Sequence, residues 1–218
     1  MRPLKASNSV TSSRIGAARV AWYATGRFYV SDDGTLQDAG YFLHLGEIRG
    51  ALFCELPGGE QSATGAQGAT GAMSEKTALF TFYAEPWRAT SVNNGDLSLS
   101  LAPPGDFMIY FNEAGGADFA DPRSFARGVR IATFRRAEQV VTTTVSSGQT
   151  KLFGINVFTA DLVESRPFEY GGVSYDLGAM LPGGVSQWGV AGEDPLPAPP
   201  PGVSAVVPFV GSAVAALR

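Results

Sequence analysis

Residues 77–111 alternate short strand-like runs with strong turn signals, and this pattern limits the folds open to the chain more than any other feature. The strand-like runs are residues 77–84, 97–101 and 107–111. Between them stand an Asn-Asn-Gly sequence at 93–95, which tolerates positive φ, and a Pro-Pro-Gly sequence at 103–105, where proline cannot donate to a strand ladder. The stretch therefore predicts an antiparallel β-meander.

The same alternation continues on both sides of this stretch. Turn-rich segments separate further runs, which lie at residues 20–30, 41–45, 51–56, 129–135, 139–145, 151–163, 168–177 and 185–190. The runs at 41–45 and 51–56 are close enough to predict a hairpin around Ile48. The clearest helix signal is Asp121 followed by Pro122, the pattern of an N-cap and a first helical position. We therefore expect little helix.

These strands predict an all-β fold, a single antiparallel β-barrel, with a two-sheet β-sandwich as the alternative. The chain has 218 residues, of which 44% are hydrophobic and 17% charged, so it can bury one core of ordinary size. Several runs, such as LFTFY and FGINVF, are apolar or small on both faces. A barrel accounts for this because one face lines the interior and the other can lie under a cover.

In length, meander pattern and poverty of helix the chain resembles small calycin-type and allene-oxide-cyclase-like barrels. Trp22 lies near the first strand, where lipocalins carry the tryptophan of a Gly-x-Trp motif, but Val20 occupies the glycine position. The resemblance is one of architecture, and it assigns no role to any residue.

The predicted organisation has three parts. Residues 1–18 are expected to form a disordered basic leader, 19–193 the β-barrel domain, and 194–218 a Pro-rich linker with a short apolar segment, read as a last strand or a tail. The glycine-rich segment 57–74 is predicted to be a mobile surface loop. The single cysteine, which allows no internal disulfide, fits a cytoplasmic protein, and the Arg- and Ser-rich composition of the leader leaves organelle targeting as the alternative.

Charge and composition exclude several function classes. The chain has 16 basic and 20 acidic residues, and after residue 30 no basic run is longer than Arg135-Arg136, so we expect no nucleic-acid partner. Its single cysteine and single histidine are too few for a disulfide or a His/Cys zinc site. The apolar stretch 202–217 is shorter than the roughly twenty residues of a spanning helix, so no membrane span is expected. Nucleotide-binding and metal-binding motifs are absent from the sequence, so we expect no cofactor.

The sharpest candidate for chemistry is the pair His44 and Cys54. If 41–45 and 51–56 form a hairpin, both side chains share one face and point into the barrel, where the imidazole can activate the thiol. Glu55 or Glu113 is the possible carboxylate partner, since a carboxyl group buried in an apolar barrel has a raised pKa and suits acid–base work. A buried structural cysteine beside a histidine is the competing interpretation.

Polar and aromatic residues at strand ends are the second group of candidates. Such residues gather at the mouth of a barrel, where they can shape a pocket or hold a ligand. The predicted ligand-binding residues are Tyr83, Trp87, Arg88, Asn112 and Trp22. Residues at the barrel rim that serve only in packing would give the same sequence pattern.

Two function classes remain open at this stage. The 14 Phe, 7 Tyr and 3 Trp residues favour a barrel that binds a small hydrophobic molecule, and a catalytic version would be an isomerase or cyclase in biosynthesis. The alternative is a non-catalytic structural or protein-interaction domain, with an oligomer as one form of it. A ligand pocket in the barrel interior would favour the small-molecule-binding function. A filled core with an exposed apolar face would favour the interaction domain.

Overall fold

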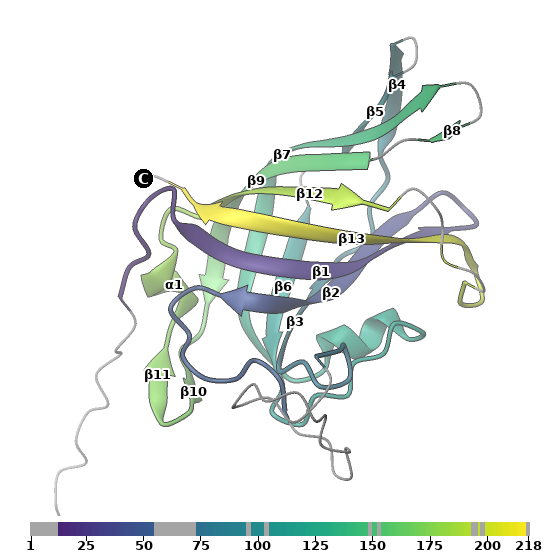
Figure 1. Cartoon of the computed structure of the whole chain (residues 1–218). Coiled ribbons are helices and arrows are strands. Elements are labelled where there is room, and N and C mark those ends of the chain that lie inside the picture. Colours follow the sequence, from purple (N-terminus) through teal and green to yellow (C-terminus); the bar gives the residue numbers. More distant parts are fainter. Residues whose placement is uncertain are drawn as a thin grey trace, which may run out of the picture.

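The computed structural model of the chain describes residues 13–54, 73–94, 97–102, 105–147, 150–151, 154–192, 196 and 199–216. Within these ranges eight antiparallel strands close into a barrel, and helix is almost absent (Figure 1). The predicted barrel is therefore confirmed. The ring order is β7 (Val129–Ser147), β6 (Asp106–Phe111), β3 (Phe80–Ala84), β2 (Leu36–Leu45), β1 (Val20–Ser31), β13 (Val203–Ala215), β12 (Val185–Ala191) and β9 (Gly154–Ser165), which pairs with β7.

Strand β7 is 19 residues long and extends beyond the ring. Its first part pairs with β6, and its later part pairs with β5 (Leu97–Ala102), which forms a hairpin with β4 (Thr90–Asn94). The short strand β8 (Thr150–Lys151) folds back on the end of β7. Figure 1 shows β4, β5 and this end of β7 projecting from the barrel as an arm.

Aromatic side chains fill much of the barrel interior. The ring centroid of Trp22 lies 5.7 Å from that of Phe42, 5.6 Å from that of Phe134 and 6.3 Å from that of Phe107, all at edge-to-face angles. All four side chains are buried. Pairs of this geometry contribute about 0.5–1.5 kcal/mol each beyond the area that they bury.

One end of the barrel is closed by the segment that follows β9. This segment contains the hairpin of β10 (Phe168–Tyr170) and β11 (Val173–Tyr175), and the single helical turn α1 (Leu177–Met180). The ring of Phe168 lies 5.5 Å from that of Phe111 and 5.8 Å from that of Phe80. The closed end is therefore apolar and aromatic.

A second, smaller core lies on the outside of the barrel, beneath residues 112–128. Its buried members are Tyr29, Ala39, Tyr83, Met108, Ala117, Phe119, Phe125 and Val206. The covering segment contains the 3-10 helix η1 (Pro122–Ala126), which appears at the predicted helix position. In β1, β2, β3 and β6, one face lines the barrel interior and the other lies under this covering segment, as predicted.

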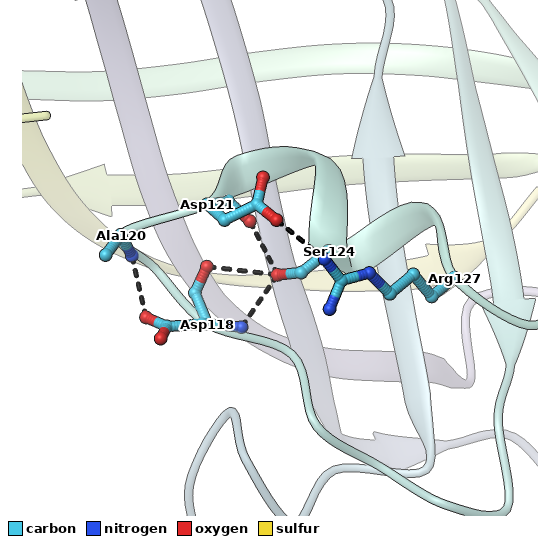
Figure 2. A network of polar contacts seen from close by, with 5 residues as sticks. All are labelled: Asp118, Ala120, Asp121, Ser124 and Arg127. Atoms are coloured by element: carbon cyan, nitrogen blue, oxygen red, sulfur yellow. Dashed lines mark hydrogen bonds and ion pairs between the residues drawn. The ribbon is translucent and has the colours of Figure 1, made fainter. Parts of the chain in front are cut away.

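A local polar network holds this cover in shape (Figure 2). The Ser124 hydroxyl oxygen accepts a hydrogen bond from the Asp118 backbone N–H at 2.7 Å and lies 2.5 Å from the Asp121 carbonyl, to which it donates. Arg127 forms an exposed ion pair with the Asp121 carboxylate at 2.8 Å. Because all these partners belong to the cover itself, we read the network as structural.

The cover is tied to the barrel by Tyr29, whose hydroxyl donates to the Phe119 carbonyl at 2.9 Å in a buried position. Burial also raises the pKa of this phenol. Tyr29→Phe should lower the free energy of unfolding by about 1–2 kcal/mol, because it leaves a buried carbonyl without its donor. Urea denaturation measures the change, with Tyr23→Phe at an exposed position as the control. Equal stability of the two variants would show that this bond contributes nothing.

Three strand predictions need correction. The runs 77–84, 97–101 and 107–111 do not form a meander, because β3 pairs with β6 while β5 pairs with β4 and β7. Residues 41–45 and 51–56 do not form a hairpin: β2 pairs with β1 and β3, and Phe53 makes only an isolated bridge to Ala78. Residues 129–135 and 139–145 belong to one strand, β7, whose register shifts at bulges instead of ending in a turn. The predicted run 168–177 is a hairpin, in which the Gly171-Gly172 turn joins β10 to β11.

The predicted domain limits also change. Strand β13 pairs with β1 and β12, so the barrel continues past the predicted boundary at residue 193. The apolar C-terminal segment is thus a last strand and not a tail. Ile15, which was assigned to the leader, is buried and its N–H donates to the Met180 carbonyl. Residues 1–12 and most of the loop 57–74 lie outside the described residues.

Candidate functional site

The end of the barrel away from the aromatic closure contains a buried pair of opposite charges. Asp38 lies on β2, two residues before Gly40 on the same face, and Arg136 lies on β7 next to a bulge. The Arg136 Nη2 atom is 3.6 Å from Asp38 Oδ1, and the two side chains are 3% and 13% exposed. Charged side chains are rarely buried so deeply, and this pair is the most unusual feature of the interior.

Aromatic rings hold the guanidinium of Arg136. Its Cζ atom lies 4.3 Å from the ring centroid of Trp87 and 5.7 Å from that of Phe158. Trp87 is anchored to the start of β2, because it exchanges backbone hydrogen bonds of 2.8 Å and 2.7 Å with Leu36. Cation–π contacts that exclude water are worth about 2 kcal/mol or more, so the arginine has partners besides Asp38.

The charged pair lines a small cavity. The enclosed space is about 20 Å³, enough for one water molecule, and the hollow around it, counted with the solvent at its mouth, has about 340 Å³ free of atoms. The Trp22 indole N–H donates to Gln187 Oε1 at 3.0 Å at the edge of this space. The lining residues are Trp22, Ala24, Asp38, Phe42, Phe82, Phe107, Arg136, Phe158, Gln187 and Phe209.

Several buried polar atoms at this end make no hydrogen bond within the described part of the protein. They include two acceptors, Asp38 Oδ1 and Asn156 Oδ1, and one donor, the indole nitrogen of Trp87. An unsatisfied buried polar group costs about 1–3 kcal/mol. A site that keeps such groups together has unused capacity to bind polar atoms.

Burial raises the pKa of the Asp38 carboxyl group, and the nearby Arg136 guanidinium only partly offsets this rise. The folded protein therefore holds this proton more tightly than the unfolded chain does. Asp38 stabilises the fold at pH values below its ordinary pKa, and this contribution is lost as the pH rises through the pKa of the folded state. A carboxyl group with a raised pKa suits general acid–base chemistry.

This shift gives a pH-dependent prediction. The stability of the parent protein should fall relative to that of Asp38→Asn as the pH rises above about 4, because the asparagine cannot ionise. Denaturation curves at a series of pH values measure the difference. A difference that stays constant with pH, or that grows in favour of the parent, would contradict the raised pKa.

The predicted pair His44 and Cys54 is not a common interior site. A bulge in β2 opposite Tyr23 and Ala24 turns both Leu43 and His44 outward, so the prediction that His44 faces inward is wrong. The imidazole is exposed and lies 5.9 Å from the ring of Tyr23. Cys54 is half-buried and packs against the core, with its backbone N–H bonded to the Thr77 carbonyl.

The predicted carboxylates do not reach the pocket either. Glu113 is exposed, and Glu55 lies outside the described residues. Asn112 serves a turn, since its amide donates to the Gly115 carbonyl at 2.7 Å.

The predicted ligand-binding residues divide into two groups. Trp22 lines the cavity and Trp87 packs on Arg136, so these two belong to the interior site. Tyr83 faces the outer core, where its hydroxyl accepts a hydrogen bond from Gln37. Arg88 is exposed and pairs with Asp33 on the surface.

The sequence interpretation missed Asp38 and Arg136. Asp38 stands two and four residues before Gly40 and Phe42, and this alternation was the available signal that it shares their inward face. Arg136 was read only as half of a basic pair. Nothing in its neighbourhood indicated burial.

Comparison with protein-family models, curated proteins and solved structures finds no match to this chain. Among the described residues no cluster of three or more His, Cys, Asp or Glu side chains is arranged to hold a metal ion. In the same residues, no helix has the length and apolar character needed to cross a membrane. The fold and site define a closed antiparallel barrel with a charged pair in an aromatic interior.

Proposed function

We propose that the barrel binds a small, largely apolar molecule at the interior site around Asp38 and Arg136. The observation that carries this proposal is the concentration of buried polar groups at one end of an otherwise aromatic interior. A core that served only stability would be more stable with apolar residues at these positions. Ligand sites combine an apolar lining with a few polar groups in this way.

A ligand larger than a water molecule requires side chains to move, because the enclosed space of about 20 Å³ is well below that of an ordinary ligand pocket. Gln187 is the natural gate, since it is half-buried and lies at the edge of the cavity. Its side-chain oxygen accepts a hydrogen bond from the Trp22 indole N–H. Rotation of this flexible side chain would widen the cavity.

The same site suits proton-transfer chemistry on an apolar substrate, as in an isomerisation or a cyclisation. Asp38 would serve as the acid or base, because burial raises the pKa of its carboxyl group. Arg136 would stabilise negative charge that develops on the substrate, held in place by Trp87 and Phe158.

Binding can be tested by thermal-shift measurements with a set of small aromatic and aliphatic molecules. We expect at least one to raise the melting temperature of the parent protein and to have a much smaller effect on Ala24→Val, which adds bulk to the cavity wall. Val157→Ala, at an exposed position on the outer face, is the control and should respond as the parent does. Failure of every molecule to stabilise the parent, or equal responses of the parent and Ala24→Val, would overturn the proposal.

A protein-interaction domain is the second candidate, and the outer face of β9, β12, β13 and β1 favours it. Trp188, Val157 and Val210 are 54%, 53% and 57% exposed on adjacent strands. The register places Val157, Trp188, Ser212 and Tyr23 in one row across these strands. Large exposed apolar side chains that lie together are typical of binding surfaces.

A second copy of the chain is the partner that this face fits. Strands β12 and β13 contain no charged residue, so two copies that meet at these two strands about a twofold axis would bring no like charges together there. Sedimentation velocity over a range of concentrations would show a dimer that Trp188→Ser weakens. A protein that is monomeric at all concentrations would exclude this assembly.

A further inference from the structure

The buried polar atoms of the interior site differ in whether they lack a hydrogen-bond donor or an acceptor. This difference restricts which ligands can bind. Asp38 Oδ1 and Asn156 Oδ1 are buried acceptors that receive no hydrogen bond from the described part of the protein. Asp38 is the one of the two that lines the cavity. A carboxyl oxygen can accept a hydrogen bond in both its ionised and its protonated form. What Asp38 Oδ1 lacks is a donor.

Arg136 does not supply that donor to Asp38 Oδ1. The distance of 3.6 Å from its Nη2 atom exceeds a normal hydrogen bond, although it allows attraction between the charges. Stacking on Trp87 at 4.3 Å holds the guanidinium in its present position. The space beside Asp38 is therefore open to a donor that comes from a bound molecule.

The charges around the cavity favour an uncharged molecule. Among the lining residues, Asp38 and Arg136 carry charge, and their formal charges cancel. An anionic ligand would place a second negative charge beside Asp38, and a cationic ligand a second positive charge beside Arg136. Uncompensated charge in an apolar interior is strongly unfavourable.

Most of the remaining lining is aromatic, which favours a ligand that contains a ring. Five phenylalanines and Trp22 surround the space, and flat ligands gain from edge-to-face and stacked contacts with such side chains. We infer, on the basis of the function proposed above, that the ligand is an uncharged aromatic molecule whose hydroxyl group donates a hydrogen bond to Asp38, as a phenol does.

Four probes of similar size test this inference on the full chain at pH 8: phenol, toluene, benzoate and benzylamine. They share a ring and differ in being a neutral donor, a neutral non-donor, an anion and a cation. Titrations followed by calorimetry or by NMR should give phenol the highest affinity, roughly tenfold above toluene, because toluene has no hydroxyl group to donate a hydrogen bond to Asp38 Oδ1. Benzoate and benzylamine should bind more weakly than phenol.

Two variants connect the preference to Asp38. Asp38→Val removes the acceptor and should abolish the preference for phenol over toluene, whereas Asp38→Asn keeps an acceptor oxygen and should retain part of it. If Asp38→Val does not fold, the carboxyl carbon of Asp38 in the parent protein provides the second measurement. Its ¹³C resonance should shift on addition of phenol and not on addition of toluene, and identical shifts with the two probes would contradict the inference.

The outcomes separate this inference from the proposed function. If toluene binds as well as phenol, the pocket binds apolar molecules but Asp38 does not select a donor, and the inference is wrong. Tighter binding of benzoate would assign recognition to Arg136 and also overturn it, as would tighter binding of benzylamine. If none of the four probes binds and the thermal-shift set also fails, the proposed function itself is wrong.

Discussion

Replacing Arg136 with methionine should lower the free energy of unfolding by about 3–5 kcal/mol at pH 8, because it leaves the Asp38 carboxylate buried without a compensating charge. The loss should shrink as the pH falls, since Asp38 then takes up a proton and no charge remains to be compensated. Asp38→Asn alone should have a much smaller effect, because Arg136 keeps its contacts with Trp87 and Phe158. The double variant Asp38→Asn/Arg136→Met should recover most of the stability lost in Arg136→Met.

Urea denaturation of the four proteins gives the coupling free energy between the two positions, which should be about 2–3 kcal/mol. The exposed pair Arg88–Asp33 is the control: its atoms approach to 2.6 Å, yet the side chains are 68% and 60% exposed. The corresponding variants Arg88→Met and Asp33→Asn should show little or no coupling, because water screens exposed charges. Equal coupling in the two pairs would mean that burial adds nothing to the interaction of Asp38 with Arg136.

Replacing Gly40 with alanine should lower the free energy of unfolding by about 3 kcal/mol, at the upper end of the usual cost of overpacking. Gly40 of β2 is opposite Gly26 of β1, and the rings of Phe82 and Phe209 lie against these two residues. A Cβ atom on Gly40 would be 2.1 Å from the Thr25 carbonyl oxygen and 2.6 Å from Gly26 Cα. Backbone atoms cannot yield as a flexible side chain does, so the two strands would have to separate.

Gly16→Ala is the control for this substitution. The Cβ atom there would approach only the Arg19 side chain, at 3.3 Å, and the stability should change by less than about 0.5 kcal/mol. Chemical denaturation of both variants measures the difference. If Gly40→Ala is as stable as the parent, the close approach of β1 and β2 does not limit the geometry of the barrel.

The sequence predicts strand positions better than strand pairing. Between residues 77 and 111, β3, β5 and β6 are found close to their predicted limits, but β4 was missed, and it includes Asn93 and Asn94 of the predicted turn. The predicted meander is also wrong, because β3 pairs with β6 and β5 pairs with β4 and β7. The pairing of residues 41–45 was predicted wrongly because a bulge and a long connection leave no local signal. Which strands meet in a closed ring depends on contacts between distant residues, and single-sequence patterns do not report these.

The candidate site was harder to predict than the fold. Trp22 and Trp87 were identified because large aromatic residues in strands are expected to pack inside. Asp38 and Arg136 are charged, and a charged residue in a strand is ordinarily assigned to the surface. Strands β2 and β7 are not neighbours in the ring, so neither residue indicates the other in the sequence.

The position of β13 between β1 and β12 also determines when the barrel can form during synthesis. Strand β1 is made first, but one of its two neighbours, residues 203–215, is made last. Until that segment leaves the ribosome, β1 and β12 each have a bare edge that other chains can pair with. Such long-range pairing also slows folding. Nascent chains should therefore depend on chaperones for most of their synthesis, and truncation before residue 203 should cause aggregation.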